Sequence, residues 1–395
     1  MRRTVSDSYA EINRQILELA DAYRYEPWRV RIIDMQRASV QFPNPPVAIV
    51  PKCSNTDINY FTLVMQANGF TFTTSELTSI GSLSHKLTSP YGIEQSDPDG
   101  DTSSLIVSYD GNPIPDFGSI QLREIMGKPS AYYFPYKDTR SGQPLSFYLI
   151  VNPYENCAFR CKYCSRLPYF KTPAPSIQEN IQLIISNILA VVQDPDEVKF
   201  INIITGSFPN PEQEMTFLKE VITAFNKAGF VESEFGVYTS QIYSRHLFEQ
   251  LRDLGVIFFT VTLEATSSDA RSRLHARRNP KRARSFEQTL DTISVAEDVF
   301  PFVSTTMMLG YEQADEVKRN LGRLAKETRS TVNHYIPRVW LPGQLDLLHP
   351  SATNLKYFVD LFNFIERNVN VGRMTSNQLF EERFLIPRFA MRYRS

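Results

Sequence analysis

The sequence SFYLIVNPYENCAFRCKYC, residues 146–164, joins an apolar, β-rich run to three closely spaced cysteines. The run at 146–152 predicts a strand, since it is rich in aromatic and β-branched residues. Asn152-Pro153 predicts the end of that strand, because proline lacks a backbone N–H and restricts the residue before it. The cysteines, which we therefore expect on the loop after the strand, are Cys157, Cys161 and Cys164.

β-rich runs and amphipathic segments alternate downstream of this loop. The β-rich runs cover residues 198–204, 235–240, 256–263, 302–309 and 331–338. The amphipathic segments include residues 177–192, 211–228 and 285–299. Strands separated by helical patterns imply a parallel sheet with crossover helices. We expect an α/β fold, a partial (β/α)6 TIM-like barrel, with the active site at the carboxyl ends of the strands.

The region before the barrel follows a different pattern. We expect a smaller N-terminal α+β region over residues 1–140, a barrel core over 141–345 and a C-terminal helical extension over 346–395. Apolar residues at i, i+3, i+4 spacing predict a helix at 6–23, and Asp110-Gly111 predicts a hairpin turn. No motif with a chemical role occurs in the first region. A substrate lid, a partner-docking module and a small winged-helix fold would each fit it.

The composition is that of an ordinary soluble globular protein. Of 395 residues, 42% are hydrophobic and 22% are charged, and the formal net charge is −1. This balance gives no overall electrostatic attraction to nucleic acid or to a membrane surface. No apolar run reaches the roughly 18–20 residues of a membrane-spanning helix, and the N-terminal residues lack a secretory apolar segment. We expect a cytoplasmic protein with neither membrane nor nucleic acid as a partner.

The four cysteines indicate a metal centre rather than disulfides. Three of them fall within eight residues, and the fourth is Cys53. Clustered cysteines in a reducing compartment point to a metal, and thiolates suit iron–sulfur clusters or zinc. A cubane cluster needs four ligands, so three thiolates leave one iron open, which is typical of a catalytic site. Zinc, with Cys53 or one of the five histidines as fourth ligand, is the other interpretation.

The C-x3-C-x2-C spacing, with Tyr163 before the last cysteine and a (β/α)6 pattern around it, resembles the radical S-adenosylmethionine (SAM) superfamily. The resemblance covers residues 146–340, with biotin-synthase-like features in the later strands. It implies one [4Fe–4S] cluster on the three cysteines and SAM bound to the open iron. It also implies reductive cleavage of SAM to methionine and a 5′-deoxyadenosyl radical, which abstracts hydrogen from a substrate. By the same resemblance, Tyr163 lies against the adenine.

The resemblance implies further SAM contacts. Thr205-Gly206-Ser207 stands where the family carries a G-G-E-like stretch that binds the SAM amino group. Thr262-Leu263-Glu264 resembles an N-L-D-T-like strand end, so we expect Thr262 and Glu264 to hold the ribose hydroxyls. Leu309, at the end of the fifth strand, is expected near the adenine. In the basic run at 271–284, the candidates for binding the SAM carboxylate are Arg273 and Arg284.

The substrate contacts are expected at the strand ends, where the candidates are Tyr238, Ser240, His334 and Arg338. No cysteine follows Cys164, so a second cluster is not expected. We expect a small-molecule substrate, of amino-acid or natural-product type, and an electron donor such as flavodoxin or ferredoxin. Two other functions stay open. One is transfer of the SAM aminocarboxypropyl group by the same cluster, and the other is a zinc-stabilised binding module without catalysis.

Overall fold

The chain forms two compact units. A computed structural model describes residues 9–38, 62–67, 70–75, 91–95, 104–114, 120–123, 131–137, 144–153, 157–159, 161–164, 176–190, 192, 194–239, 241–275, 284–336 and 342–373. The N-terminal unit comprises Met1–Lys128, Ile336–Leu345 and Pro350–Asn363. The barrel unit comprises Pro129–Tyr335, Asp346–His349 and Phe364–Ser395.

The N-terminal unit combines helices with an antiparallel sheet. Its helices are α1 (Tyr9–Tyr23), α2 (Pro27–Ala38) and most of α9 (Leu355–Phe364). The strands run in the order β2-β1-β6-β4-β3, with β5 paired to β4. They are β1 (Thr62–Ala67), β2 (Phe70–Ser75), β3 (Tyr91–Gln95), β4 (Ser104–Tyr109), β5 (Asn112–Pro113) and β6 (Ile120–Arg123). The predicted hairpin turn is confirmed: Asp110 and Gly111 join β4 to β5, both at positive φ.

A buried carboxylate ties α2 to β3 in this unit. Asp34, which is 1% exposed, accepts hydrogen bonds from the Tyr91 hydroxyl at 2.7 Å and from the Arg37 guanidinium at 2.5 Å. The Tyr91 ring packs edge-on against Tyr109 of β4. A charged group is buried at low cost only with such partners, so these contacts fix the helix on the sheet.

The barrel unit is built on a seven-stranded sheet in the order β13-β12-β11-β10-β9-β8-β7. From β8 to β13 each strand pairs parallel with the next, and β7 pairs antiparallel with β8. The strands are β7 (Ala131–Lys137), β8 (Pro144–Val151), β9 (Val198–Ile204), β10 (Glu234–Thr239), β11 (Val256–Glu264), β12 (Phe302–Met308) and β13 (Thr331–Tyr335). The predicted α/β fold with a partial (β/α)6 barrel is confirmed.

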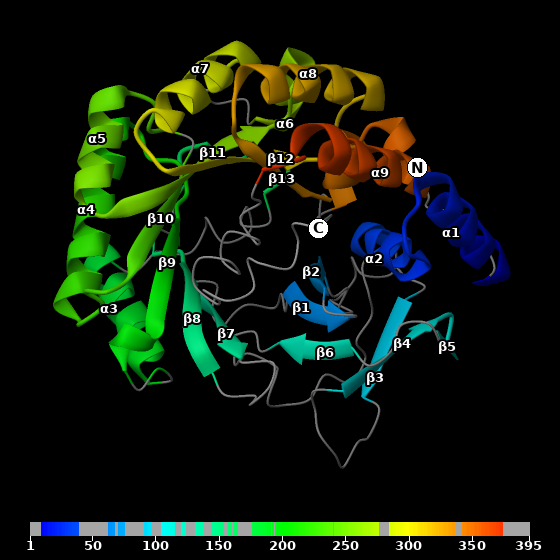
Figure 1. Ribbon diagram of the computed structural model, residues 1–395, viewed down its shortest axis with the longest axis horizontal. Helices are drawn as coiled ribbons and strands as arrows, with labels where there is room; N and C mark the ends of the chain where they lie inside the picture. The colour runs from blue at the N-terminus through cyan, green and yellow to red at the C-terminus, as the bar shows by residue number, and fades with distance from the viewer. Residues whose placement is uncertain are drawn as a thin grey trace. The chain divides into compact units, whose positions relative to one another are not determined.

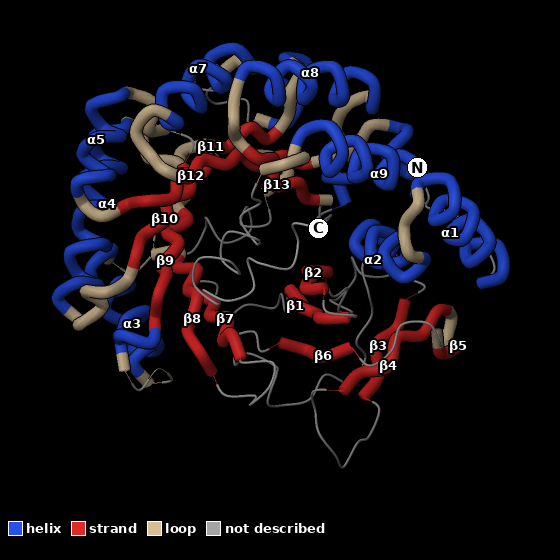
Figure 2. The backbone as a smooth tube through the Cα atoms, in the orientation of Figure 1, coloured by secondary structure: helices blue, strands red, loops and turns tan. Residues whose placement is uncertain are grey.

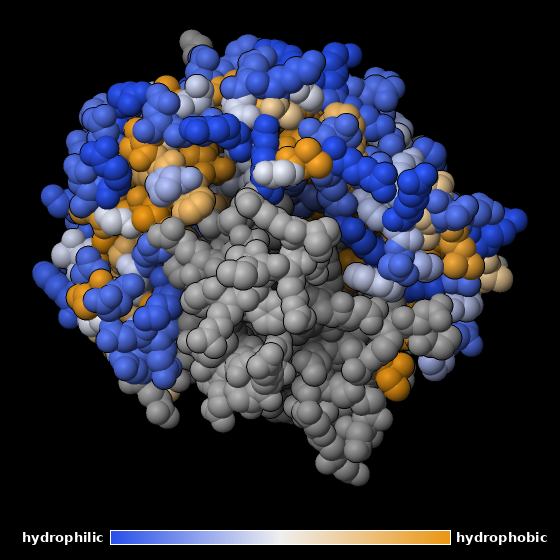
Figure 3. Space-filling view, viewed as in Figure 1, coloured by the Kyte–Doolittle hydropathy of each residue, from blue (hydrophilic) through white to orange (hydrophobic). Residues whose placement is uncertain are grey.

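The crossover helices lie on the outer side of the curved sheet (Figures 1 and 2). They are α3 (Ile177–Leu189), α4 (Pro211–Lys227), α5 (Arg245–Asp253), α6 (Ser268–Leu274), α7 (Phe286–Glu297) and α8 (Ala314–Glu327). Capping boxes at Ser176 and Ser285 begin α3 and α7, because each serine accepts from the backbone three residues on. The outer surface of α7 and α8 is largely hydrophilic (Figure 3). Among the described helices, none is long and apolar enough to cross a membrane.

Side chains on the two faces of the sheet differ. Phe259 of β11 points to the helix side, where its ring stacks on Phe300 at 4.9 Å and meets Phe248 of α5 edge-on at 4.9 Å. Because side chains alternate along a strand, the neighbouring Thr260 points to the concave face. At the C-terminal edge of the sheet, the cysteine loop leaves β8. Apolar side chains therefore cover the helix side of the sheet there, and polar side chains lie on its concave side.

Candidate functional site

The cysteine loop after β8 is held between two neighbouring segments. On one side, the Ala158 N–H donates to the Ser207 carbonyl at 2.7 Å, and the Ser207 N–H donates to Cys157 Sγ at 3.2 Å. On the other side, the Lys162 N–H donates to the Leu274 carbonyl at the end of α6, at 2.8 Å. The loop is thus fixed to the carboxyl ends of β9 and β11, through the segments that follow those strands.

The thiols of the three cysteines lie close enough to affect one another. Burial raises the pKa of the Cys161 thiol well above its usual range, and the charges of Glu264, Cys157 and Cys164 raise it further. Cys161 is 7% exposed, and the other two thiols are partly exposed. Thiolates in this place need compensating positive charge. The iron atoms of an iron–sulfur cluster would supply it, so the donor set fits such a cluster.

Glu264 ends β11 in a backbone conformation that few non-glycine residues adopt. Its φ is +61°, and the pairing of β11 with β12 shifts register between Thr262 and Glu264. The left-handed region costs an L-residue roughly 1–2 kcal/mol, and irregularities of this kind re-aim side chains near active sites. The strained backbone therefore indicates that the site requires the Glu264 carboxylate to point in one particular direction.

Two side chains hold the Glu264 carboxylate in place. His275 Nε2 lies 2.8 Å from Glu264 Oε2, and the Tyr163 hydroxyl also hydrogen-bonds to the carboxylate. Burial works to raise the pKa of Glu264, but these hydrogen bonds and the charges of His275 and Arg271 outweigh it and lower the pKa. Glu264 is therefore ionised at neutral pH and able to accept hydrogen bonds from vicinal hydroxyl groups.

The second ring nitrogen of His275 reaches the cysteine loop. Nδ1 lies 3.5 Å from Cys161 Sγ, so one imidazole contacts both a cysteine and the predicted ribose ligand. The ligand atoms of Cys161, Glu264 and His275 lie within 4.8 Å of one another. That set of a thiolate, a carboxylate and an imidazole also suits a single zinc ion.

The loop after β9, Thr205-Gly206-Ser207, is tied to a buried carboxylate. Glu214 in the first turn of α4 accepts from the Thr205 hydroxyl at 3.0 Å and from the Thr239 hydroxyl at 2.5 Å. It is fully buried, and burial raises its pKa to about 7 although both hydrogen bonds lower it. Ser207 contributes its backbone to Cys157. Thr205-Gly206-Ser207 contains no carboxylate of its own, so the carboxylate that contacts this loop is Glu214 of α4.

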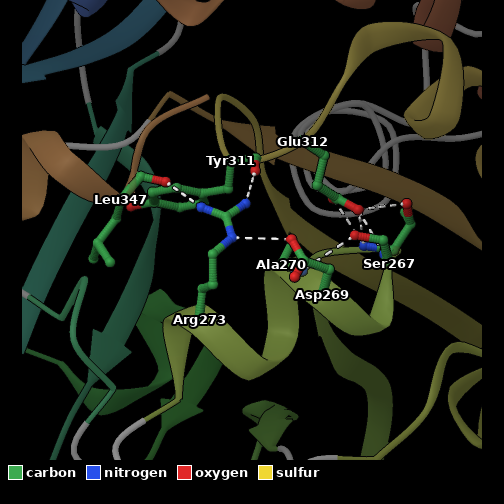
Figure 4. Close-up of polar contacts among 8 residues, drawn as sticks. Ser267, Asp269, Ala270, Arg273, Tyr311, Glu312 and Leu347 are labelled. Atoms are coloured by element: carbon green, nitrogen blue, oxygen red, sulfur yellow. Dashed lines mark hydrogen bonds and ion pairs between the residues drawn. The ribbon is translucent and has the colours of Figure 1, made fainter. Parts of the chain in front are cut away.

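Arg273, a candidate for the SAM carboxylate, is held by main-chain groups. Its guanidinium donates to the carbonyls of Tyr311 at 2.7 Å and Leu347 at 3.0 Å, and pairs with Asp269 at 3.1 Å (Figure 4). The fork of donors thereby joins α6 to the segments after β12 and β13. To bind a carboxylate, Arg273 would have to exchange one of these contacts.

Arg284, the other candidate, lies at the start of α7. It donates to the Gln288 carbonyl at 2.8 Å and stacks over the Tyr243 ring at 4.2 Å from its centroid. Its own carbonyl accepts from Arg271, whose Nε also donates to the Ala265 carbonyl at 2.6 Å. Arg271 therefore links the backbone of Arg284 to that of Ala265, the residue after Glu264.

The concave face of the sheet carries a belt of polar side chains. The Tyr238 hydroxyl lies 2.5 Å from Thr306 Oγ1, and Asn333 Nδ2 donates to Ser304 Oγ at 3.3 Å. Thr262 lies on the same face and donates to a main-chain carbonyl of β10 at 3.2 Å. Burial raises the pKa of Tyr238, so this phenol stays neutral at physiological pH.

The remaining residues predicted to contact SAM or the substrate are His334, Leu309, Ser240 and Arg338. His334 follows Asn333 on β13 and therefore points to the opposite, helix-covered face. Leu309 is buried, and its N–H donates to the Tyr335 carbonyl at 2.8 Å. Ser240 and Arg338 lie outside the described residues. Within the described part of the chain, Tyr238 is therefore the substrate candidate on the concave face.

His275 and Glu214 were not singled out from the sequence. Glu214 shares the apolar stripe of α4 with Leu218, Val221 and Phe225, at helical spacing, and a carboxylate on such a stripe is a signal that could have found it. His275 stands in a basic run at 271–284, and no periodicity marks it.

Residues 151–324 match one protein family. The model of the family described as the radical SAM superfamily matches residues 151–324. Among solved structures, the FeFe-hydrogenase maturase HydG from Carboxydothermus hydrogenoformans is 13% identical, with TM-score 0.41 over 56% of this chain and 51% of that chain. Methylornithine synthase (PylB) is 11% identical, with TM-score 0.40 over 55% of this chain and 61% of that chain.

A third structure is SuiB of Streptococcus suis bound to S-adenosylmethionine. It is 13% identical, with TM-score 0.35 over 48% of this chain and 41% of that chain. The chain spans about half the length of the HydG chains that it matches. No curated protein matches its sequence.

Proposed function

Residues 151–324 are a radical SAM domain, and from this premise we propose that the protein cleaves SAM reductively to a 5′-deoxyadenosyl radical. The family uses a [4Fe–4S] cluster and SAM as its cofactors. We propose further that the radical abstracts hydrogen from a small, polar substrate of amino-acid or natural-product type. One observation carries the proposal: Cys161, His275 and Glu264 meet in one buried contact at the carboxyl end of β11.

The residues that would hold the cluster are Cys157, Cys161 and Cys164. When bound and reduced, the cluster supplies the electron that breaks the bond between the SAM sulfur and its 5′-carbon, which leaves methionine and the radical. The protein's own part is orientation. The ionised Glu264 is suited to two ribose hydroxyls, and Tyr163, hydrogen-bonded to Glu264, offers its ring to the adenine.

The concave face supports a polar substrate. Its hydroxyl and amide groups come from Tyr238, Thr262 and Asn333, and the buried hydroxyls of Thr306 and Ser304 hydrogen-bond to Tyr238 and Asn333. Such groups pair with substrate amino, hydroxyl or carboxylate groups, whereas a lipid-like substrate calls for an apolar lining. We propose an electron donor of the flavodoxin or ferredoxin type, because an acidic protein complements the basic run at 271–284.

Nucleoside analysis tests the proposal. Protein reconstituted anaerobically with iron and sulfide is reduced in the presence of SAM, and the products are separated by mass spectrometry. We expect 5′-deoxyadenosine. Methylthioadenosine in its place would indicate aminocarboxypropyl transfer, and intact SAM in the presence of a reduced cluster would refute the proposal. Glu264→Gln is the matched variant: it should retain the cluster and bind SAM more weakly, because a neutral amide replaces the carboxylate.

A zinc-stabilised binding module is the second candidate function. It is favoured by the proximity of the Cys161, Glu264 and His275 ligand atoms, within 4.8 Å. A colourless protein with about one zinc per chain and no SAM cleavage would support it. In that case Glu264→Gln would weaken zinc binding, which it would not do to a cluster held by three cysteines.

A further inference from the structure

The end of β11 turns sharply at Glu264. The Ala265 N–H donates to the Leu263 carbonyl at 2.8 Å, and the φ of Glu264, the residue between them, is +61°. A hydrogen bond across three residues with a positive central φ is a γ-turn of the rare and strained form. Leu263 and Ala265 are both fully buried, so the turn is packed on both sides. A strained backbone of this kind persists only where the surrounding structure holds it in place.

The carboxylate of Glu312 binds the two residues that follow Ala265. It accepts from the Thr266 N–H at 2.8 Å, from the Thr266 hydroxyl at 2.9 Å and from the Ser267 N–H at 2.5 Å. Figure 4 shows this carboxylate directed at Ser267, which caps the start of α6. Glu312 is 3% exposed and lies after β12. One buried side chain therefore ties the end of β11 to the segment after the next strand.

Two more side chains fix the same segment. Arg271 Nε donates to the Ala265 carbonyl at 2.6 Å, and Asn320 Nδ2 donates to the Thr266 hydroxyl at 3.0 Å. The Thr266 hydroxyl thus accepts from Asn320 while it donates to Glu312. The backbone after Glu264 is therefore held by three side chains, of which Glu312 alone binds two consecutive N–H groups.

We propose that Glu312 is a positioning residue for SAM. By holding Thr266 and Ser267, it maintains the γ-turn and thereby the direction in which the Glu264 carboxylate points. The inference rests on the proposed function, because it requires SAM whose ribose hydroxyls bind to Glu264.

The γ-turn decides which groups Glu264 reaches. In a regular strand Glu264 would continue the row of Thr260 and Thr262 on the concave face, since side chains alternate along a strand. The pairing with β12 instead shifts register between Thr262 and Glu264, and the carboxylate meets Tyr163 and His275. If the turn relaxed, the carboxylate would leave these partners. SAM would then lose a ribose ligand although no residue in contact with SAM had been changed.

A double-mutant cycle tests this role. Glu312→Gln keeps the size of the side chain but turns an amide NH2 group toward one of the N–H donors. The relaxed turn then competes with the strained one, so we expect the Kd for SAM to rise about tenfold. Glu264→Ala removes the carboxylate itself. If Glu312 acts through Glu264, adding Glu312→Gln to Glu264→Ala changes the Kd no further, whereas a general loss of structure would raise it in both backgrounds.

Equilibrium binding of radiolabelled SAM to the anaerobically reconstituted proteins gives the four Kd values, once equal iron and sulfide content has been verified. Asp315→Asn is the control, because Asp315 is exposed three residues after Glu312, and its Kd should stay near the wild-type value. Hydrogen exchange gives a second readout that does not depend on SAM. Exchange of the Thr266 and Ser267 amides should accelerate in Glu312→Gln and not in Asp315→Asn.

Thr266→Val is a milder variant, which serves if Glu312→Gln does not fold. It removes the hydroxyl contact with Glu312 and keeps the side-chain size and the backbone N–H donor. The loss of one hydrogen bond should raise the Kd for SAM about threefold in the wild-type background. The same substitution should leave the Kd unchanged in the Glu264→Ala background.

An unchanged Kd in Glu312→Gln would overturn the role of Glu312, and so would an equal rise in both backgrounds. Either result leaves the proposed function standing when the wild-type protein forms 5′-deoxyadenosine. Wild-type protein that carries a full cluster and binds no SAM would overturn the proposed function, and this inference with it.

Discussion

Replacement of Glu214 by glutamine should change how stability depends on pH. Glu214 is fully buried beneath the ends of β9 and β10, and burial raises its pKa from 4.5 to about 7. The unfolded chain thus loses this proton near pH 4.5, whereas the folded protein keeps it until about pH 7. Between these values the folded state binds more protons, so the carboxylate makes stability fall as pH rises, and the loss is complete above pH 7.

The magnitude follows from the shift in pKa. One pKa unit corresponds to about 1.36 kcal/mol, so the full loss is about 3 kcal/mol, of which roughly 2.5 kcal/mol falls between pH 5 and pH 8. Glu214→Gln does not titrate, and its side-chain oxygen can still accept from Thr205 and Thr239. Relative to wild type, the free energy of unfolding of the variant should therefore rise by roughly 2.5 kcal/mol from pH 5 to pH 8.

Urea unfolding at a series of pH values measures this difference. Titrations of other groups cancel between the two proteins, since they share those groups. Glu212→Gln is the control, because Glu212 is exposed in the same helical turn, and its stability should parallel that of wild type. A constant difference between Glu214→Gln and wild type from pH 5 to pH 8 would refute the reasoning.

The remaining predictions concern packing and loop order. Phe259→Ala removes a buried ring that stacks on Phe300 and meets Phe248 edge-on, so urea unfolding should show a loss of about 3–5 kcal/mol. Val231→Ala, at a position 66% exposed, should change stability by less than about 0.5 kcal/mol, and equal losses would contradict the assigned core. Arg273→Lys cannot keep the forked contacts to the Tyr311 and Leu347 carbonyls, so amide hydrogen exchange should accelerate in the segments after β12 and β13. Unchanged exchange there would contradict a role for the guanidinium in their order.

The parallel strands were predictable because they are buried on both faces, and such strands form nearly continuous apolar runs. The predicted run at 256–263 is strand Val256–Glu264, and the run at 198–204 is strand Val198–Ile204. The last strand is shorter than predicted. It ends at Tyr335, shortly before Pro337, and proline disfavours continuation of a ladder.

Antiparallel pairing was harder to predict. The segment Ala131–Lys137 contains Pro135, which argues against a central strand, but β7 lies at the edge of the sheet, where proline is tolerated. In the N-terminal unit, β1 pairs with β6 across more than fifty residues. Such long-range pairing leaves no local pattern in either strand.

The candidate site was predictable where chemistry follows from local spacing. Three cysteines within eight residues predicted a metal centre, and a glutamate at the end of a barrel strand predicted a functional carboxylate. The contact of His275 with Cys161 joins residues 114 positions apart. It depends on the path of the chain between β8 and α6, and no spacing encodes that path.

Iron and sulfide analysis of cysteine variants tests the central claim most directly. Cys157→Ala, Cys161→Ala and Cys164→Ala are reconstituted anaerobically beside wild type and Cys53→Ala, and iron, acid-labile sulfide and zinc are counted per chain. The proposed cluster predicts about four irons and four sulfides in wild type and in Cys53→Ala, and loss of both from each of the other three variants. Wild-type protein with about one zinc and no sulfide, or full iron and sulfide content in the Cys161→Ala variant, would contradict the assignment of the cluster to these three cysteines.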